Sequence, residues 1–267
     1  MLVQSSVMFF DEGAGADVDR RPLLPNHGHL LTLVTCQIGF AGDPEREAGA
    51  HAAAKWKRSL GRLELFKKSA LGTVGMQRIQ IGASGIESGE TQAGWQVRTP
   101  TFTAALYPGS LVVEDRQYTT FDRFIAVLKP IVDALGEVTT PEIFLTFALR
   151  YQNVFQSAEA RTPAFWRSRI RPAYMAGTGS GLFLPRLQGC LSIMTLSHDN
   201  QAVQIRAGIQ PAPNSLWQAL IDYETTETTG TEFSWDEISE VAQRTNTTCL
   251  RVFQELLEPE YLSELHG

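Results

Sequence analysis

Alternating apolar and polar residues predict β-strands over much of this chain. In residues 30–40 every second side chain belongs to one set: Thr32, Val34, Cys36, Ile38 and Phe40. Between residues 75 and 116, short alternating segments are separated by glycine-rich turns, and no helix-length segment lies between them. Strands spaced so closely favour antiparallel meanders over β-α-β units.

Apolar residues at helical spacing predict two long amphipathic helices. The first covers residues 119–136, with a capping box of Thr119 and Asp122, an end at Gly136 and this stripe: Phe121, Phe124, Ile125, Leu128, Val132 and Leu135. The second covers residues 234–257, begins at Ser234 with Glu237 as its capping partner, and has this apolar face: Ile238, Val241, Thr245, Cys249, Val252, Phe253 and Leu256. A basic helix is also predicted within residues 51–70, despite Gly61.

These elements indicate an α+β fold, with mostly antiparallel sheets covered by the two long helices. Each half of the chain places several strands before one amphipathic helix, which suggests a pseudo-repeat. We therefore expect an irregular lead-in over residues 1–29, a first half over 30–157 and a second half over 158–267, the two halves packed as one unit.

Composition and charge narrow the function classes. The chain has 267 residues, of which 43% are hydrophobic and 19% charged, so it can bury a proper core. Its net charge of −6 argues against a protein that coats nucleic acid, although a local basic patch stays open. Residues 222–264 hold eleven acidic side chains against two arginines. This segment is either a solvated acidic helix or a partner-binding surface.

Cysteine content and the N-terminus predict a soluble cytoplasmic protein. Three widely spaced cysteines, Cys36, Cys190 and Cys249, form no C-x-x-C pair and suit reduced thiols. The first fifteen residues lack the basic start of a signal peptide, and no apolar stretch approaches the ~20 residues that a membrane helix needs. We expect no metal, no cofactor and no contact with a membrane.

The strand over residues 143–155 raises the question of why a buried strand carries an arginine. Its odd positions, from Ile143 to Tyr151, are apolar and are predicted to face the core, so Arg150 projects from the other face. Residues 217–225 alternate in the same way and place Asp222 on the second face. If the two strands lie in one sheet in matching sense, Arg150 and Asp222 can meet as an ion pair.

Several familiar catalytic and binding patterns are absent or incomplete. Ser197, His198 and Asp199 are sequence neighbours and cannot adopt triad geometry, so a loop is expected there. The two histidines of residues 27–29 lack a third metal ligand at helical spacing. The glycine-rich residues 177–181 lack the Lys-Ser/Thr of a phosphate loop, and no G-x-S-x-G elbow occurs.

Two basic runs keep a nucleic-acid function open. The candidate contacts are Lys55, Lys57, Arg58, Arg62, Arg167, Arg169 and Arg171. With Trp56, Phe165 and Trp166 between them, they would offer cations for phosphates and rings for stacking. The alternative is that these cations lie on solvated helix faces, while the aromatic residues anchor the helices.

Four segments resemble a sporadically distributed bacterial protein family of unknown function that carries an L-R-Y-x-N strand motif. They are TLVTCQIGF at 32–40, VVEDRQYTTFDRF at 112–124, LRYQN at 149–153 and ALIDYE at 219–224. The resemblance spans most of residues 30–257 and implies a candidate polar cluster of Tyr118, Arg150, Tyr151, Asn153 and Asp222. It carries no catalytic assignment, and it implies a role in a toxin, defence or mobile-element system.

Three functions follow as expectations. The leading one is a non-enzymatic interaction or regulatory module with a protein partner. The second is a protein that binds or processes nucleic acid through the basic runs at 55–68 and 161–171. The third is an enzyme whose site assembles from Tyr118, Arg150, Asn153 and Asp222. Oligomeric state and partner identity stay open.

Overall fold

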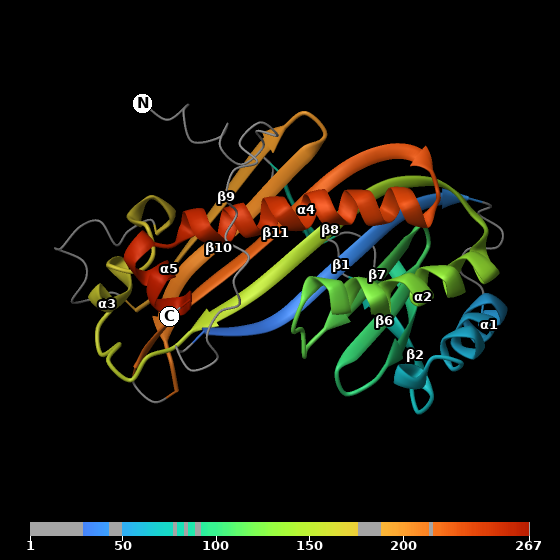
Figure 1. The fold of residues 1–267 in the computed structure, drawn as a ribbon, viewed down its shortest axis with the longest axis horizontal. Helices are drawn as coiled ribbons and strands as arrows, with labels where there is room; N and C mark the ends of the chain where they lie inside the picture. Colours follow the sequence, from blue (N-terminus) through green and yellow to red (C-terminus); the bar gives the residue numbers. More distant parts are fainter. Residues whose placement is uncertain are drawn as a thin grey trace. The chain divides into compact units, whose positions relative to one another are not determined.

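The computed structural model describes residues 29–42, 50–76, 79–82, 85–88, 92–175, 188–213 and 216–266. These residues form an α+β fold with a large antiparallel sheet, which confirms the predicted fold class (Figure 1). The helices are α1 (Ala50–Leu60), α2 (Phe121–Thr139), α3 (Ala164–Arg167), α4 (Trp235–Leu256) and α5 (Pro259–His266). A 3₁₀ turn, η2, covers Glu64–Phe66.

Within the described residues, nine strands are hydrogen-bonded in one order: β2 (Ala70–Met76), β5 (Gln92–Arg98), β6 (Phe102–Tyr107), β7 (Ser110–Asp115), β1 (His29–Gly42), β8 (Pro141–Phe155), β11 (Trp217–Glu232), β10 (Gln201–Pro211) and β9 (Cys190–His198). Strands β3 (Ile79–Gly82) and β4 (Gly85–Ser88) form a separate antiparallel pair.

The chain divides into two compact units. Unit 1 takes in the described residues among Met1–Val34, Ala148–Glu227 and Ala242–Gly267, and unit 2 takes in those among Thr35–Phe147 and Thr228–Val241. Strands β1, β8 and β11 and helix α4 therefore each contribute residues to both units. The predicted boundary between residues 157 and 158 stays a prediction. It separates two halves with a similar order of elements, whereas the two units are defined by how compactly their residues pack.

The core of unit 1 lies between its sheet and the second part of α4. Odd-numbered residues of β11 are buried from Ala219 to Glu227, and they pair with buried residues of β10 such as Val203, Ile205 and Ala207. Figure 1 shows α4 lying along these strands. Its predicted apolar face is confirmed in this unit, since Val252 and Leu256 are fully buried.

Polar side chains also join α4 to the sheet of unit 1. The Tyr151 hydroxyl donates to Oδ1 of Asn246 at 2.8 Å, and the Cys249 thiol donates to Oγ1 of Thr225 at 3.3 Å. Arg244 of α4 donates to the buried carboxylate of Glu227 at 2.7 Å. Helix α4 is thus held in one register by directional bonds as well as by apolar contact.

Unit 2 packs α1 and α2 together beside its own strands. Ser59 of α1 donates to Oε2 of Glu137 on α2 at 2.6 Å, and Trp56 and Leu60 are fully buried. Strand β6 is buried along its whole length, from Phe102 to Tyr107. The predicted basic helix ends early, at Leu60, and η2 and β2 follow it.

The predicted ends of the first long helix are each displaced. The N-cap of α2 is Thr120, whose hydroxyl accepts from the backbone N–H of Arg123 at 3.2 Å, rather than Thr119. The helix also continues past Gly136 to Thr139, and Thr140 adopts the left-handed conformation at its end. For α4 the predicted cap is confirmed, because the Ser234 hydroxyl accepts from the N–H of Glu237.

Strand β8 corrects the predicted core pattern at its start. Ile143 and Leu145 are 43% and 39% exposed, whereas Phe144 is fully buried. From Phe147 onward the odd residues are buried as predicted, through Phe155. The buried positions therefore change from even to odd numbering between Phe144 and Phe147.

Candidate functional site

The face of the unit 1 sheet opposite α4, called here the outer face, carries half-buried polar side chains of β8, β10 and β11. Its rows follow the strand pairing: Thr195 pairs with Gln204 and Gln204 with Glu224, Ile193 with Arg206 and Arg206 with Asp222, and Leu191 with Gly208 and Gly208 with Leu220. Because alternate residues point to opposite faces, the members of each row project to the same side.

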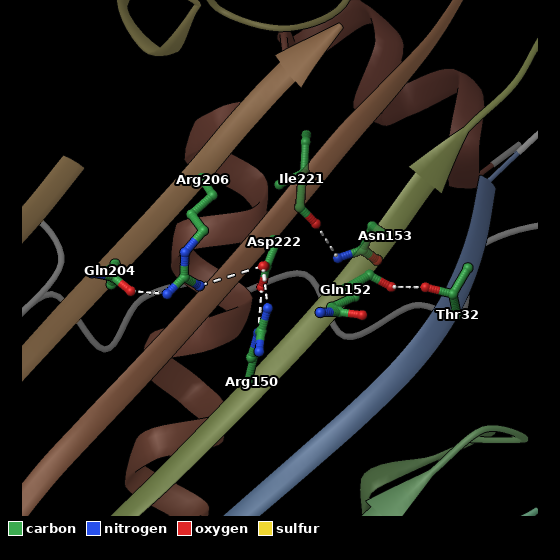
Figure 2. Close-up of polar contacts among 8 residues, drawn as sticks. All are labelled: Thr32, Arg150, Gln152, Asn153, Gln204, Arg206, Ile221 and Asp222. Carbon is green, nitrogen blue, oxygen red and sulfur yellow. Dashed lines mark hydrogen bonds and ion pairs between the residues drawn. The ribbon is translucent and has the colours of Figure 1, made fainter. Parts of the chain in front are cut away.

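An ionic network centred on Asp222 crosses the outer face. Arg150 donates from Nε to Oδ1 of Asp222 at 2.7 Å and from Nη2 to Oδ2 at 2.5 Å, a bidentate pair (Figure 2). Arg206 donates from Nη1 to Oδ2 of Asp222 at 3.3 Å and from Nη2 to Oε1 of Gln204. The carboxylate is 18% exposed and the two guanidinium side chains about a third or less, so the network is partly desolvated.

The hypothesised meeting of Arg150 and Asp222 is therefore present, and the strands that carry them run antiparallel. Moving along β8 from Asn153 to Gln156, the hydrogen-bonded partners on β11 move back from Ile221 to Gln218. Arg206 and Gln204 were missed in the sequence. The alternation of β10, which buries Val203 and Ile205, marks them as outward-facing and was the signal available.

The other predicted cluster residues lie apart from this network. Tyr151 and Asn153 point to the buried face, where the Asn153 amide donates to the Ile221 carbonyl at 3.3 Å. Tyr118 belongs to unit 2, and its ring centroid lies 6.2 Å from that of Phe124. Of the five residues, the structure brings together Arg150 and Asp222 on one face and Tyr151 and Asn153 on the other.

An apolar rim borders the ionic network on β9. Leu191 is 60% exposed and Ile193 is 63% exposed. The two residues are two positions apart on β9, so both side chains lie on the outer face. No aspartate, glutamate, lysine or arginine occurs between Cys190 and His198. Exposed branched apolar side chains on an uncharged strand are typical of a surface that meets another protein.

The basic run on α1 is partly committed to internal contacts. Lys55 donates to the backbone carbonyl of Glu137, and Arg62 lies 3.4 Å from the carboxylate of the same residue. The side chains of Lys57 and Arg58 make no hydrogen bond or ion pair within the described residues. Trp56 is fully buried, so it anchors α1 and offers no stacking surface.

The second basic run is largely built into the fold of unit 1. The Arg169 guanidinium lies 3.7 Å from the ring centroid of Phe165 and 5.4 Å from that of Tyr261. Arg171 pairs with Glu255 and donates from Nε to the Leu257 carbonyl at 3.1 Å. Trp166 is fully buried, and Arg167 is half-buried.

A buried carboxylate ends β7 in unit 2. Oδ1 of Asp115 accepts from the backbone N–H of Gln117 at 2.7 Å, and Oδ2 lies 3.6 Å from Nη1 of Arg123 without a hydrogen bond. Burial raises the pKa of Asp115, while the Gln117 N–H and the Arg123 charge oppose that shift. Arg123 also donates to the Gln117 carbonyl at 2.7 Å, so both groups fasten the turn that leads into α2.

Two of the three thiols are inaccessible. Burial raises the pKa of Cys249 to about 12 and also raises the pKa of Cys36, whereas Cys190 is half-buried on β9. His198 ends β9 and Asp199 lies in the following turn with φ of 50°, so the Ser-His-Asp run is a hairpin end. The glycine-rich residues 177–181 and His27 lie outside the described residues.

Metal-like clusters and membrane-spanning helices are not found in the described part of the chain. Nowhere among those residues do three or more His, Cys, Asp or Glu side chains gather as metal ligands would. None of the helices there combines the length and the apolar character needed to cross a bilayer.

Comparison with known proteins adds no assignment. No protein-family model matches the chain, and no curated protein matches it.

Proposed function

We propose that this protein is a non-enzymatic interaction or regulatory module that binds a protein partner through the outer face of unit 1. The observation that carries the proposal is the pair of exposed apolar residues, Leu191 and Ile193, beside the network of Arg206 and Asp222. The buried centre of a protein interface is more apolar than the rest of the surface, and arginine is enriched there.

The bonding of Asp222 supports a binding role over a catalytic one. Both of its carboxylate oxygens accept N–H groups from Arg150, and Oδ2 also accepts from Arg206. A carboxylate held in this way is poorly placed to take a proton from a substrate. The third expected function, an enzyme built on Tyr118, Arg150, Asn153 and Asp222, is weakened further because Asn153 projects to the opposite face.

The finer architecture forms part of the proposal. Strands β5, β6 and β7 precede α2, and strands β9, β10 and β11 precede α4, each set being an antiparallel meander followed by a long helix with a hydroxyl cap. This order supports a pseudo-repeat in which α2 and α4 are the two covering helices. The cytoplasmic location, and a partner within a toxin, defence or mobile-element system, rest on the sequence alone.

Affinity purification from the host tests the proposed function. The full chain and its Leu191→Ser/Ile193→Ser variant would be purified side by side, and the co-purifying chains identified by mass spectrometry. We expect a stoichiometric partner that is lost with the variant, because two apolar anchors are removed. Leu220→Ser changes a less exposed residue of the same face, and its effect on partner recovery is compared with that of the double variant. Equal recovery of every chain by wild type and variant would contradict the proposal.

A second candidate is nucleic-acid binding through α1, which Lys57 and Arg58 favour because neither is paired within the described residues. With Trp56 buried, contact would be with phosphates and would weaken steeply with salt. The test is a mobility shift with duplex and single-stranded DNA at two salt concentrations. Lys57→Glu/Arg58→Glu should abolish the shift, and Lys129→Glu, at a lysine paired with Asp133, should leave it unchanged.

A further inference from the structure

We propose that the partner of the outer face is a second copy of this chain, the two sheets lying face to face about a two-fold axis that runs parallel to β10 and β11 between them. The inference rests on the proposed function, since it assigns the occupant of the same surface. Each copy would offer the same patch to the other, as in most closed homodimers.

The strand register makes the outer face complementary to itself. Strand β10 presents Gln204, Arg206 and Gly208, and β11 presents their direct neighbours Glu224, Asp222 and Leu220. A two-fold axis between the strands exchanges β10 with β11 and keeps each row at its own level. Arg206 then faces Asp222 of the second copy, and the Gln204 amide faces the Glu224 carboxylate.

The third row carries no charge. Leu220 of one copy faces Gly208 of the other, and Gly208 has no side chain on that face. The glycine is required there, because a Cβ at Gly208 would lie 2.3 Å from the Cys190 carbonyl oxygen. Gly208 is buried beside the backbone of β9, so this row adds only the half-buried Leu220, and the two charged rows carry the recognition.

The charge of the face also favours a second copy. Arg150 and Arg206 balance Asp222 and Glu224, so this patch is neutral although the whole chain carries −6. Two such patches attract each other when β10 of one copy lies over β11 of the other, because opposite charges then meet. A strongly basic or acidic partner would gain no such advantage.

The apolar rim is buried by the same arrangement. Strand β9 lies next to β10, and β8 lies next to β11. The axis therefore places β9 of one copy over β8 of the other, where Ile193 lies opposite Gln152 and Leu191 opposite Val154. Both rims are covered, because the arrangement is symmetric.

The size of the face sets the expected strength of binding. Four strands about 4.8 Å apart and nine residues of about 3.4 Å give a footprint on the order of 600 Å² per copy. Standard protein interfaces bury about 800 Å² per partner. We therefore expect a reversible dimer that dissociates on dilution.

Sedimentation equilibrium of the purified full chain, over a concentration series, tests the inference with two charge variants. Arg206→Glu places acid over acid, and Asp222→Arg places arginine over arginine, so each variant alone should be monomeric. Their equimolar mixture restores both attractive rows and should dimerise again, as a heterodimer. We expect each single change to weaken the dimer by at least about tenfold.

A further variant guards against misfolding, because Asp222→Arg also removes the internal partner of Arg150. Leu191→Ser/Ile193→Ser alters exposed side chains only, should keep the circular dichroism and melting temperature of the wild type, and should also weaken the dimer at least about tenfold. A wild-type chain that stays monomeric throughout, or variants that dimerise as well as the wild type, would overturn the inference. A monomer that still captures a host protein through Leu191 and Ile193 overturns it too, yet leaves the proposed function standing.

Discussion

Asp222 joins side chains from two neighbouring strands of unit 1. Its pairs with Arg150 and Arg206 are partly shielded from water, so their charges attract each other more strongly than those of fully exposed pairs. The pair with Arg150 has the geometry that arginine favours, with two parallel N–H bonds to one carboxylate. The network therefore both pins β8 to β11 and sets the charge pattern of the outer face.

A double-mutant cycle should detect this coupling. We expect Arg150→Ala and Asp222→Ala each to lower the free energy of unfolding. The double variant should lose about 1 kcal/mol less than the sum of the two single losses. The measurement is urea unfolding followed by circular dichroism, repeated at high salt, where the coupling should shrink. Strictly additive losses would show that the pair contributes nothing to stability.

Asp115 should make stability depend on pH in unit 2. Burial raises the pKa of this carboxyl, so its protonated form is favoured in the folded state. The stability it contributes is fully present below the pKa of an unfolded aspartate and is lost as pH rises through the folded value. Asp115→Asn keeps the site neutral, and we expect a higher melting temperature than wild type at pH 7 and a shrinking difference toward pH 4.

The matched control for this change is Asp133→Asn, since Asp133 is 56% exposed on α2 and should show no such trend. A variant at Asp115 that melts lower than wild type at pH 7 would mean that attraction to Arg123 exceeds the cost of burial.

At the scale of elements, strand β8 follows a regular burial pattern along most of its length and departs from it at its start. From Phe147 to Phe155 alternate residues enter the core, but Phe144 enters it out of phase. A period-2 reading assigns one face to Ile143 and Leu145 and cannot detect this change in the buried positions, because it depends on what packs over each face of the sheet. The same reading placed Arg150 on the outer face correctly, since it lies beyond the change.

Substitutions along β8 should reproduce this division. Ile143→Thr and Leu145→Thr alter exposed side chains and should each cost less than about 1 kcal/mol of unfolding free energy. Phe144→Ala and Phe147→Ala should each cost about 3–5 kcal/mol, because both rings are fully buried. Denaturant unfolding of the four variants gives the comparison, and a large loss at Leu145 would contradict the change in the buried positions.

Sequence periodicity located α2 and α4 well and their ends less well. Their apolar stripes are long enough to be unambiguous, whereas Thr119 and Thr120 are chemically equivalent caps that only backbone geometry can separate. The residues of the candidate site were harder to predict from the sequence. Tyr151 and Asn153 are adjacent in sequence to Arg150 and Gln152, yet alternation alone sends them to the opposite side. Leu191 and Ile193 carry no sequence mark that separates an exposed apolar residue from a buried one.

At the scale of the whole molecule, the two units share four continuous elements. Strands β1, β8 and β11 and helix α4 each pass from one unit into the other. Loss of either unit would leave half of each element without its neighbours. We therefore expect the units to unfold together.

The buried thiols report on this directly, because Cys36 belongs to unit 2 and Cys249 to unit 1. Pulsed alkylation across a urea gradient, read by mass spectrometry, should modify both at the same midpoint, while Cys190 reacts already in the native state. Burial raises the pKa of both buried thiols, so neither should react before unfolding at pH 8. Two separate midpoints would show that the units open independently.

The interleaving of the two units also decides how the chain can be dissected. Neither unit is one continuous stretch, so a truncation that ends anywhere between residues 35 and 240 removes part of both. A truncated chain that loses an activity would therefore say nothing about where that activity resides. Exchange of homologous segments meets the same obstacle. So does circular permutation, since new ends within β8 or β11 would divide a strand that both units share. Binding on this molecule is best mapped one side chain at a time.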